Sequence, residues 1–197
     1  MNQVANKIEY RVISDWIDTG TSVLDLGCGD GELLTLLIRE KQVHAQGIDF
    51  SDQAIHHCIA QGLSVFQEDI DEGLSEYSDK SFDYVILNQT FQQVKKPDFV
   101  LREALRVGQK IIVGFPNFLY ITARFQMFFI GKVPVTPSLP YEWYDTPNLH
   151  FLSIADFTVY CKKRNIRIER SAFTAKNKTA KLLPNLFAET GFFLLSK

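Results

Sequence analysis

The sequence predicts an α/β fold in which helices cover both faces of a mainly parallel sheet. Two observations predict it: short apolar runs rich in β-branched residues, and amphipathic stretches that alternate with them from residue 22 to residue 117. Strands that alternate with helices in this way form a parallel sheet covered on both faces. Ligands of such sheets bind beyond the carboxyl ends of the strands, which here are expected to follow Leu26, Gly47, Gln67, Leu87 and Gly114.

The expected elements follow from periodicity and from residues that begin or end helices. An amphipathic helix opens the chain, because Val4, Ile8, Val12 and Trp16 recur at helical spacing. Five strands are then expected, at residues 22–27, 43–49, 63–69, 81–89 and 110–117. Helices are expected between them at 31–41, 51–61 and 97–107, and Pro97 suits the first turn of the last one.

The alternation pauses in a segment rich in proline and aromatic residues, 117–150, and then resumes. Ser153 and Asp156 have the spacing of a capping box, which predicts a helix over 153–165. Two closing strands are expected at 166–173 and 191–196. We therefore expect one domain over residues 1–197, with 117–150 as an inserted helix and loop segment near the site.

Charge and cysteine usage exclude several classes of protein. The formal net charge of -2 argues against nucleic acid or an anionic membrane surface as a partner. Cys28, Cys58 and Cys161 lie far apart and have neither metal-site nor disulfide spacing, so we expect no metal and a reducing compartment. The amino terminus lacks the apolar core of a signal peptide, which favours a cytoplasmic location.

The stretch VLDLGCGDGELLTLL, residues 23–37, predicts a strand, a glycine-rich loop and a helix that together hold a nucleotide. Gly27, Gly29 and Gly31 permit positive φ and let the backbone approach a ligand closely. The helix that follows offers unpaired N–H groups and a positive dipole end. A dinucleotide fingerprint would place its third glycine where Glu32 stands, which disfavours a dehydrogenase.

Two acids of this stretch, Asp25 and Asp30, disfavour a pyrophosphate. A pair of like charges ~4 Å apart costs about 4 kcal/mol at an effective dielectric constant near 20. S-adenosylmethionine fits better, because its sulfonium is positive and its ammonium would be attracted by Asp25, while the glycine amides would serve its carboxylate. A tight strand-to-helix turn without a ligand is the alternative.

Two further acids stand at successive strand ends. Asp49 follows Gly27 by about the interval that positions an acid on ribose hydroxyls. Asp69 would accept a hydrogen bond from the adenine amino group, with the Ile70 amide donating to a ring nitrogen. For each acid alone, a helix N-cap or a solvated turn is the alternative. Together the acids predict an adenosyl site formed by Asp25, Gly27, Cys28, Gly29, Asp49, Phe50, Asp69, Ile70, Asn88 and Gln89.

These stretches resemble the class I S-adenosylmethionine-dependent methyltransferases, from VLDLGCGDG through GIDFS, QEDI and FDYVILNQTFQQV to IIVGFPN. That resemblance implies a Rossmann-like, doubly wound sheet of order 3-2-1-4-5-7-6 with strand 7 antiparallel, which accounts for the two closing strands. A narrower resemblance, over 63–118 and GKVPVTPSLPYEWYDTPNLHFLSIADF, is to the MetW family of methionine biosynthesis proteins. It implies a role in making methionine, S-adenosylmethionine and S-adenosylhomocysteine as ligands, and association with homoserine O-acyltransferase.

Catalytic residues do not follow from this resemblance. Methyl transfer from a sulfonium depends on alignment, and it needs a base only if the acceptor must lose a proton. NQTFQ after the fourth strand is unlike the Asn-Pro-Pro-Tyr motif of amide and base N-methyltransferases. His150, Asp145 and Tyr144 are the candidates, although LHF before a capped helix is also typical of a structural helix entry. Two functions stay open: a methyltransferase with a small acceptor, or a non-catalytic activator of homoserine O-acyltransferase.

The apolar segment 118–130 has two interpretations, because its apolar residues fall on nearly all sides of a helix. It is either an internal helix of the core, or a helix that caps the cofactor and presents a surface to a partner. The aromatic residues Tyr141, Trp143 and Tyr144 likewise either face the sulfonium or a substrate, or pack as a loop.

Overall fold

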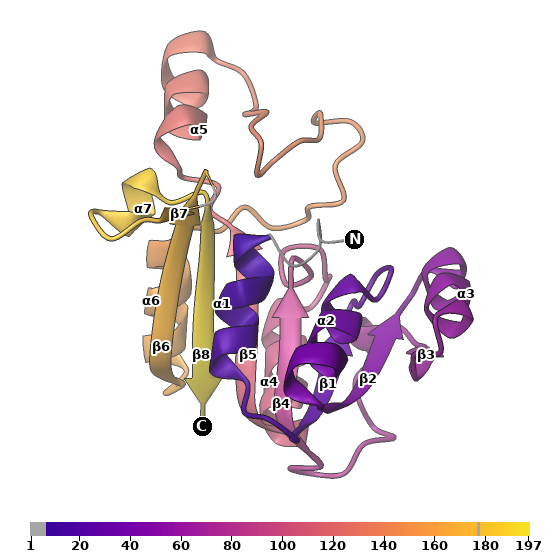
Figure 1. Cartoon of the computed structure of the whole chain (residues 1–197). Coiled ribbons are helices and arrows are strands. Elements are labelled where there is room, and N and C mark those ends of the chain that lie inside the picture. The colour runs from indigo at the N-terminus through magenta and orange to yellow at the C-terminus, as the bar shows by residue number, and fades with distance from the viewer. Residues whose placement is uncertain (1–6, 177) are drawn as a thin grey trace.

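One sheet forms the centre of the protein (Figure 1). The structure is a computed structural model and describes residues 7–176 and 178–197. Its strands are β1 (Ser22–Leu26), β2 (His44–Asp49), β3 (Val65–Gln67), β4 (Phe82–Asn88), β5 (Gly108–Pro116), β6 (Arg167–Ala175), β7 (Lys178–Thr179) and β8 (Thr190–Ser196). The strand order is β3-β2-β1-β4-β5-β8-β6-β7.

This order confirms the predicted one. The pairs that join β1 through β5 are parallel, while β8 pairs antiparallel with both β5 and β6. The strands β8 and β6 therefore occupy the positions of strands 7 and 6 in the expected order. The short β7, which pairs with β6, is an additional edge strand that was not predicted.

Helices cover both faces of this sheet, as expected. Hydrophobic side chains of α1 (Ile8–Trp16) and α2 (Glu32–Lys41) pack on one face, and those of α4 (Pro97–Val107) and α6 (Ile154–Lys163) pack on the other. The shorter elements are α3 (Asp52–Ala60), α5 (Ile121–Phe125), α7 (Pro184–Phe187), a 3₁₀ turn at Ile70–Glu72 and a π-helical turn at Gln126–Ile130. The helix predicted from Val4 is confirmed over Ile8–Trp16, while Val4 lies outside the described residues.

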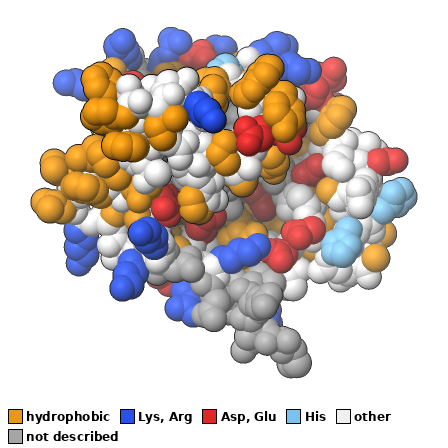
Figure 2. Space-filling model, turned by 90° about the horizontal axis from the view of Figure 1, so that it is seen from above, with side chains coloured by type: hydrophobic (Ala, Val, Ile, Leu, Met, Phe, Trp, Pro, Cys, Tyr) orange, Lys and Arg blue, Asp and Glu red, His pale blue; other side chains and the backbone are white. Residues whose placement is uncertain are grey.

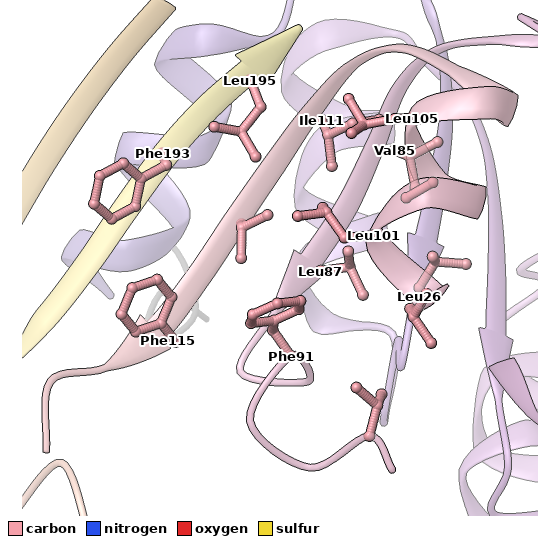
Figure 3. Close-up of a cluster of buried hydrophobic side chains, with 14 of the residues drawn as sticks. Leu26, Val85, Leu87, Phe91, Leu101, Leu105, Ile111, Phe115, Phe193 and Leu195 are labelled. Atoms are coloured by element: carbon pink, nitrogen blue, oxygen red, sulfur yellow. The ribbon is translucent and has the colours of Figure 1, made fainter. Parts of the chain in front are cut away.

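The larger hydrophobic cluster fills the space between the sheet and the layer of α4 and α6. Leu101 and Leu105 point from α4 toward the strands (Figure 3). The Phe157 ring of α6 lies with its centroid 5.0 Å from that of Phe115 and 4.8 Å from that of Phe193. Fully burying a Leu or Phe side chain contributes about 1.5–3 kcal/mol, so this layer holds the strands whose ends form the site.

Two predicted helix starts are confirmed by their hydrogen bonds. The Ser51 hydroxyl accepts from the Ala54 amide at 3.4 Å. The Ser153 hydroxyl accepts from the Asp156 amide at 3.1 Å, and the Asp156 carboxylate accepts from the Ser153 amide at 3.1 Å, which completes the capping box. Both helices therefore begin at the edge of the sheet where the parallel strands end.

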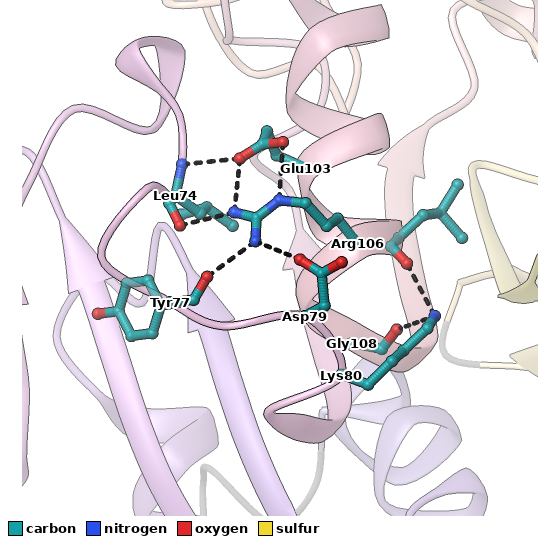
Figure 4. A network of polar contacts seen from close by, with 8 residues as sticks. Leu74, Tyr77, Asp79, Lys80, Glu103, Arg106 and Gly108 are labelled. Atoms are coloured by element: carbon teal, nitrogen blue, oxygen red, sulfur yellow. Dashed lines mark hydrogen bonds and ion pairs between the residues drawn. The ribbon is translucent and has the colours of Figure 1, made fainter.

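The opposite edge of the sheet is held by Arg106 (Figure 4). Its guanidinium donates to the carbonyl oxygens of Leu74 and Tyr77, each at 2.8 Å. It also forms ion pairs with Glu103 at 2.8 Å and with Asp79 at 2.9 Å. Because residues 74–79 lead into β4, this network fixes the start of the strand whose far end carries Asn88 and Gln89.

The segment α5 with its π-helical turn projects from the carboxyl edge of the sheet (Figure 1). Phe128 and Phe129 are 82 % and 70 % exposed. The interpretation of 118–130 as an internal core helix is therefore wrong. Near the base of the segment, Arg124 donates to the carbonyl oxygens of Leu119 and Asn185. Within the described residues, no helix has the length and apolar character needed to cross a bilayer.

Candidate functional site

A cleft of about 510 Å³ opens at the carboxyl ends of the parallel strands, within the size range of small-molecule sites. Its lining residues stand at or just after the ends of β1, β2, β3 and β4: Gly27, Gly29, Asp49, Phe50, Glu68, Asp69, Ile70, Asp71, Asn88, Gln89, Thr90, Gln93, Val94 and Lys95. Seen from this edge, acidic side chains lie around the central hollow, while hydrophobic side chains gather toward the left (Figure 2). The cleft therefore lies at the strand ends where the sequence predicts a ligand site.

The floor of the cleft is backbone, because glycine leaves no side chain there. Gly27 has a φ of +80°, and a Cβ at this position would lie 2.4 Å from the Thr90 hydroxyl oxygen. Its amide donates to the Ile48 carbonyl at 2.7 Å, which fastens the loop to β2. Gly29 also has a positive φ, +55°, with open space where a Cβ would stand. The loop can therefore bring peptide groups against a ligand.

Asp49 fixes this loop to the end of β2. One carboxylate oxygen accepts from the Gly29 amide at 2.8 Å, and the other accepts from the Ser51 amide at 2.8 Å. An ionised carboxylate offers about four lone-pair sites in total. Both oxygens therefore keep capacity to accept hydrogen bonds from ligand hydroxyls, and the predicted ribose contact stays a prediction.

Two acids after β3 have different tasks. The Asp69 carboxylate accepts from the Asp71 amide at 2.9 Å and caps the 3₁₀ turn. The buried Asp71 carboxylate accepts from the amides of Lys95 at 2.9 Å and Lys96 at 2.8 Å. Asp71 thereby ties one wall of the cleft to the other. Sequence reasoning missed it, because its partners are backbone amides, which no side-chain pattern reveals.

The end of β4 places Asn88 in the wall of the cleft. Its amide oxygen is buried, lies 2.6 Å from where a Cβ on Gly114 would stand, and has no hydrogen-bond partner among the described residues. Leaving such an atom unpaired costs about 1–3 kcal/mol. Gln89 follows with a φ of +61°, uncommon for a residue with a side chain and often found at functional sites.

Two predicted residues, Asp25 and Cys28, lie beneath the cleft and are not among its lining residues. Asp25 is 3 % exposed, and burial raises its pKa to about 7, with a further contribution from the charge of Asp49. Burial also raises the pKa of the Cys28 thiol, whose side chain packs with Leu34 and Cys58. Cys28 is therefore a packing residue rather than a reactive thiolate.

The three catalytic candidates do not line the cleft either. The Nε2 atom of His150 lies 2.9 Å from the Val94 carbonyl oxygen. Tyr144 is 70 % exposed, and Asp145 is also exposed. Among the described residues, no ion pair joins Asp145 to His150. The structure thus brings eight of the ten adenosyl-site candidates together around the cleft, and leaves His150 against the outside of its wall.

A family model decides which proteins this chain is related to. The model described as "Methionine biosynthesis protein MetW" matches residues 7–195. The chain belongs to the MetW family. A relative from Rhodopirellula baltica, "Bifunctional methionine biosynthesis protein MetXA/MetW", is 32 % identical over 203 residues, covering 96 % of this chain. The match spans 32 % of that relative's length, so this chain corresponds to about one third of the relative.

Solved structures show the fold of this MetW-family chain. A S-adenosylmethionine-dependent methyltransferase from Archaeoglobus fulgidus superposes with a TM-score of 0.74 at 18 % identity, covering 97 % of this chain and 92 % of that one. The [4+2]-cyclase SpnF superposes with a TM-score of 0.70 at 15 % identity, covering 98 % and 81 %. The fold is thus that of class I methyltransferases, and the cyclase shows that this fold serves other chemistry too.

The cleft of this MetW-family chain is lined by groups suited to binding and orienting a ligand. Its lining residues include peptide groups, carboxylates and amide side chains, but no histidine or cysteine. Over residues 7–176 and 178–197, no group of His, Cys, Asp and Glu is arranged to hold a metal ion. The arrangement suits a ligand with hydroxyl and amino donors and a positive charge.

Proposed function

We propose that this MetW-family protein binds S-adenosylmethionine in the cleft and acts in methionine biosynthesis as a methyltransferase of a small acceptor. The observation that carries the proposal is the convergence of Asp49, Asp69 and Asn88 on one cleft over a glycine floor. These groups come from the ends of three different strands. Each of them accepts hydrogen bonds, and adenosine and an α-ammonium group supply donors.

Each part of the ligand has a partner in this proposal. Asp49 accepts from the ribose hydroxyls, Asp69 accepts from the adenine amino group, and the Ile70 amide donates to a ring nitrogen. Asn88 and Gln89, which both line the cleft, hold the methionine end. S-adenosylmethionine supplies, when bound, a methyl group on a positively charged sulfur. The chain's contribution is to orient that ligand, and alignment provides much of the rate of such displacements.

The charge of the cleft supports a cationic ligand. Four carboxylates line it, those of Asp49, Glu68, Asp69 and Asp71, against the single cation of Lys95. A cleft lined by one sign of charge concentrates ligands of the opposite sign and repels like charges. A pyrophosphate-bearing dinucleotide is therefore disfavoured by the same residues that favour a sulfonium.

Calorimetric titration tests the binding half of the proposal. S-adenosylmethionine and S-adenosylhomocysteine should each bind at one site per chain, while NAD should release no binding heat under the same conditions. The absence of binding by both sulfur nucleosides would overturn it. Catalysis is tested separately by incubating the protein with S-adenosylmethionine and cell extract, where release of S-adenosylhomocysteine above background is expected.

A second candidate function is favoured by two observations. The bifunctional relative carries a MetXA and a MetW part in one chain. The exposed Phe128 and Phe129 lie in the apolar segment that projects from the carboxyl edge of the sheet. In this second proposal the protein is a non-catalytic partner that binds S-adenosylmethionine and supports homoserine O-acyltransferase. Titrating S-adenosylmethionine with and without that enzyme distinguishes the two, because only the partner function predicts an altered affinity or altered acyltransferase activity.

A further inference from the structure

The wall of the cleft formed by residues 89–96 is held from outside by the segment before α6. The amides of Leu149 and His150 both donate to the Gln92 carbonyl, at 2.9 and 3.0 Å. The His150 ring reaches one turn further and lies with Nε2 2.9 Å from the Val94 carbonyl oxygen. Because a carbonyl oxygen only accepts hydrogen bonds, Nε2 carries the proton in this pair.

The same wall touches the ligand space from its other side. Gln89 and Val94 line the cleft. The side-chain amides of Gln92 and Gln93 each donate to the Gln89 carbonyl at 2.8 Å. Gln92 is therefore bonded to Leu149 and His150 through its backbone and to Gln89 through its side chain. An unbroken chain of hydrogen bonds runs from the cleft to the segment outside it.

The segment before α6 also carries an exposed aromatic surface, a few residues ahead of Leu149 and His150. Trp143 is 70 % exposed, and its ring packs edge-on against Tyr144 with 5.7 Å between the ring centroids. Trp143 also shares a small pocket of about 80 Å³ with Asn148 and Phe151, the residues that flank Leu149 and His150. A shift of the Leu149–His150 backbone therefore changes the surroundings of the Trp143 ring.

We propose that the cleft and the aromatic surface of residues 141–151 are energetically coupled through this chain, so that ligand occupancy is reported at the surface. His150 is a positioning residue that holds Val94 and thereby the cleft wall. The coupling rests on the proposed function, since S-adenosylmethionine is the ligand that moves the wall through Asn88 and Gln89. Coupling of binding free energies is reciprocal, so a molecule that binds the aromatic surface must change the ligand affinity of the cleft by the same factor.

Variants of His150 separate this role from a general effect on folding. His150→Phe removes the donor to Val94, whereas His150→Gln places a side-chain amide where Nε2 stands. Arg106→Lys serves as the matched control, because it weakens the network at the opposite edge of the sheet and touches neither wall. The chain has two tryptophans, Trp16 and Trp143. All proteins in the experiment therefore carry Trp16→Phe, so that the tryptophan emission comes from Trp143 alone.

The experiment measures S-adenosylmethionine affinity by calorimetry and Trp143 emission in the same samples. The parent protein should change its Trp143 emission on saturation. His150→Phe should weaken binding by about fivefold or more, the lower end of typical coupling factors, and lose the emission change. His150→Gln should retain both, and Arg106→Lys should retain both despite a lower melting temperature.

Two outcomes overturn the coupling, and they differ in whether the cleft still binds S-adenosylmethionine. If S-adenosylmethionine binds with an unchanged affinity in His150→Phe and Trp143 emission stays constant on saturation, the coupling is wrong and the proposed function stands. If no variant and no parent protein binds S-adenosylmethionine, the proposed function and the coupling fall together.

Discussion

Asp49 accepts a hydrogen bond of 2.8 Å from the Gly29 amide, and so joins the end of β2 to the glycine loop after β1. The carboxylate therefore shapes the loop as well as facing the cleft. This double role determines how its variants are to be interpreted, because a loss of affinity can come from the ligand contact or from the loop.

Asp49→Ala should weaken S-adenosylmethionine binding by about 1.5–3 kcal/mol, the cost of losing hydrogen bonds to a charged acceptor, or roughly 10- to 150-fold in dissociation constant. Calorimetric titration measures it. Asp52→Ala is the matched control, since this exposed acid three residues away removes the same charge without lining the cleft. An unchanged affinity in Asp49→Ala would refute the ribose assignment.

Gly27→Ala should reduce both binding and stability, because its Cβ would overlap the Thr90 side chain, with 2.4 Å to Oγ1 and 2.7 Å to Cγ2. Gly20→Ala is the control, since Gly20 has a similar φ of +76° with no heavy atom near the added Cβ. The left-handed conformation alone costs about 1–2 kcal/mol in each variant. Only Gly27→Ala should lose ligand affinity.

Thr90→Ala in the Gly27→Ala background extends this test. Removing the two overlapping atoms should recover part of the lost stability, so that a double-mutant cycle gives a favourable interaction energy for the pair. Thermal unfolding of the four proteins measures it. Strictly additive effects would show that the Thr90 contact is not the cause.

Asp25→Asn should change the pH dependence of stability. Burial raises the Asp25 pKa from 3.8 to about 7, so between these pH values the folded protein binds a proton that the unfolded chain has released. The contribution of this group to stability is therefore present at low pH and is lost as pH rises toward 7. At 1.36 kcal/mol per pKa unit, the loss is at most about 4 kcal/mol.

The asparagine variant has no such proton to lose. The free energy of unfolding of Asp25→Asn relative to the parent should therefore rise between pH 4 and pH 7 and stay level above it, as measured by urea unfolding at several pH values. Parallel curves for the two proteins would contradict the raised pKa.

Arg106→Lys should lower stability without altering the ligand site. Lysine cannot reproduce the forked contacts to Glu103, Leu74 and Tyr77 (Figure 4), and hydrogen bonds to charged groups are worth about 1.5–3 kcal/mol each. The melting temperature should fall, while the calorimetric affinity for S-adenosylmethionine should equal that of the parent. A parallel loss of affinity would mean that the network reaches the cleft through β4.

Much of the fold was determined by local sequence. Glycines at positions 27, 29 and 31 have the positive φ values that the loop was expected to need, because glycine lacks the Cβ that makes this conformation costly for most other residues. The acids Asp49 and Asp69 stand in the cleft because the ends of parallel strands meet at one edge. Strand order and family were likewise accessible, since both follow from motifs that are contiguous in the chain.

Other features were decided only by the tertiary structure. Asp71 binds the backbone amides of Lys95 and Lys96, and a contact between a side chain and a distant backbone leaves no pattern in the sequence. The apolar segment 118–130 was expected either to be an internal core helix or to cap the cofactor and present a surface to a partner, and the 82 % exposure of Phe128 contradicts the first of these. Composition predicts that apolar side chains favour burial, but only the packing of the whole chain decides which of them find a partner.

Asp25 and His150 also show which features follow from the sequence and which depend on the tertiary structure. The sequence by itself determined that an acid stands near the end of the first strand and that a histidine precedes a capped helix. The tertiary structure decided that Asp25 lies beneath the cleft, with its pKa raised to about 7 by burial, and that His150 is bonded to Val94 on the outside of the wall. Residue type and spacing fix which chemical groups are available, whereas burial and long-range hydrogen bonds fix which of them meet the ligand space, because these depend on how distant segments pack.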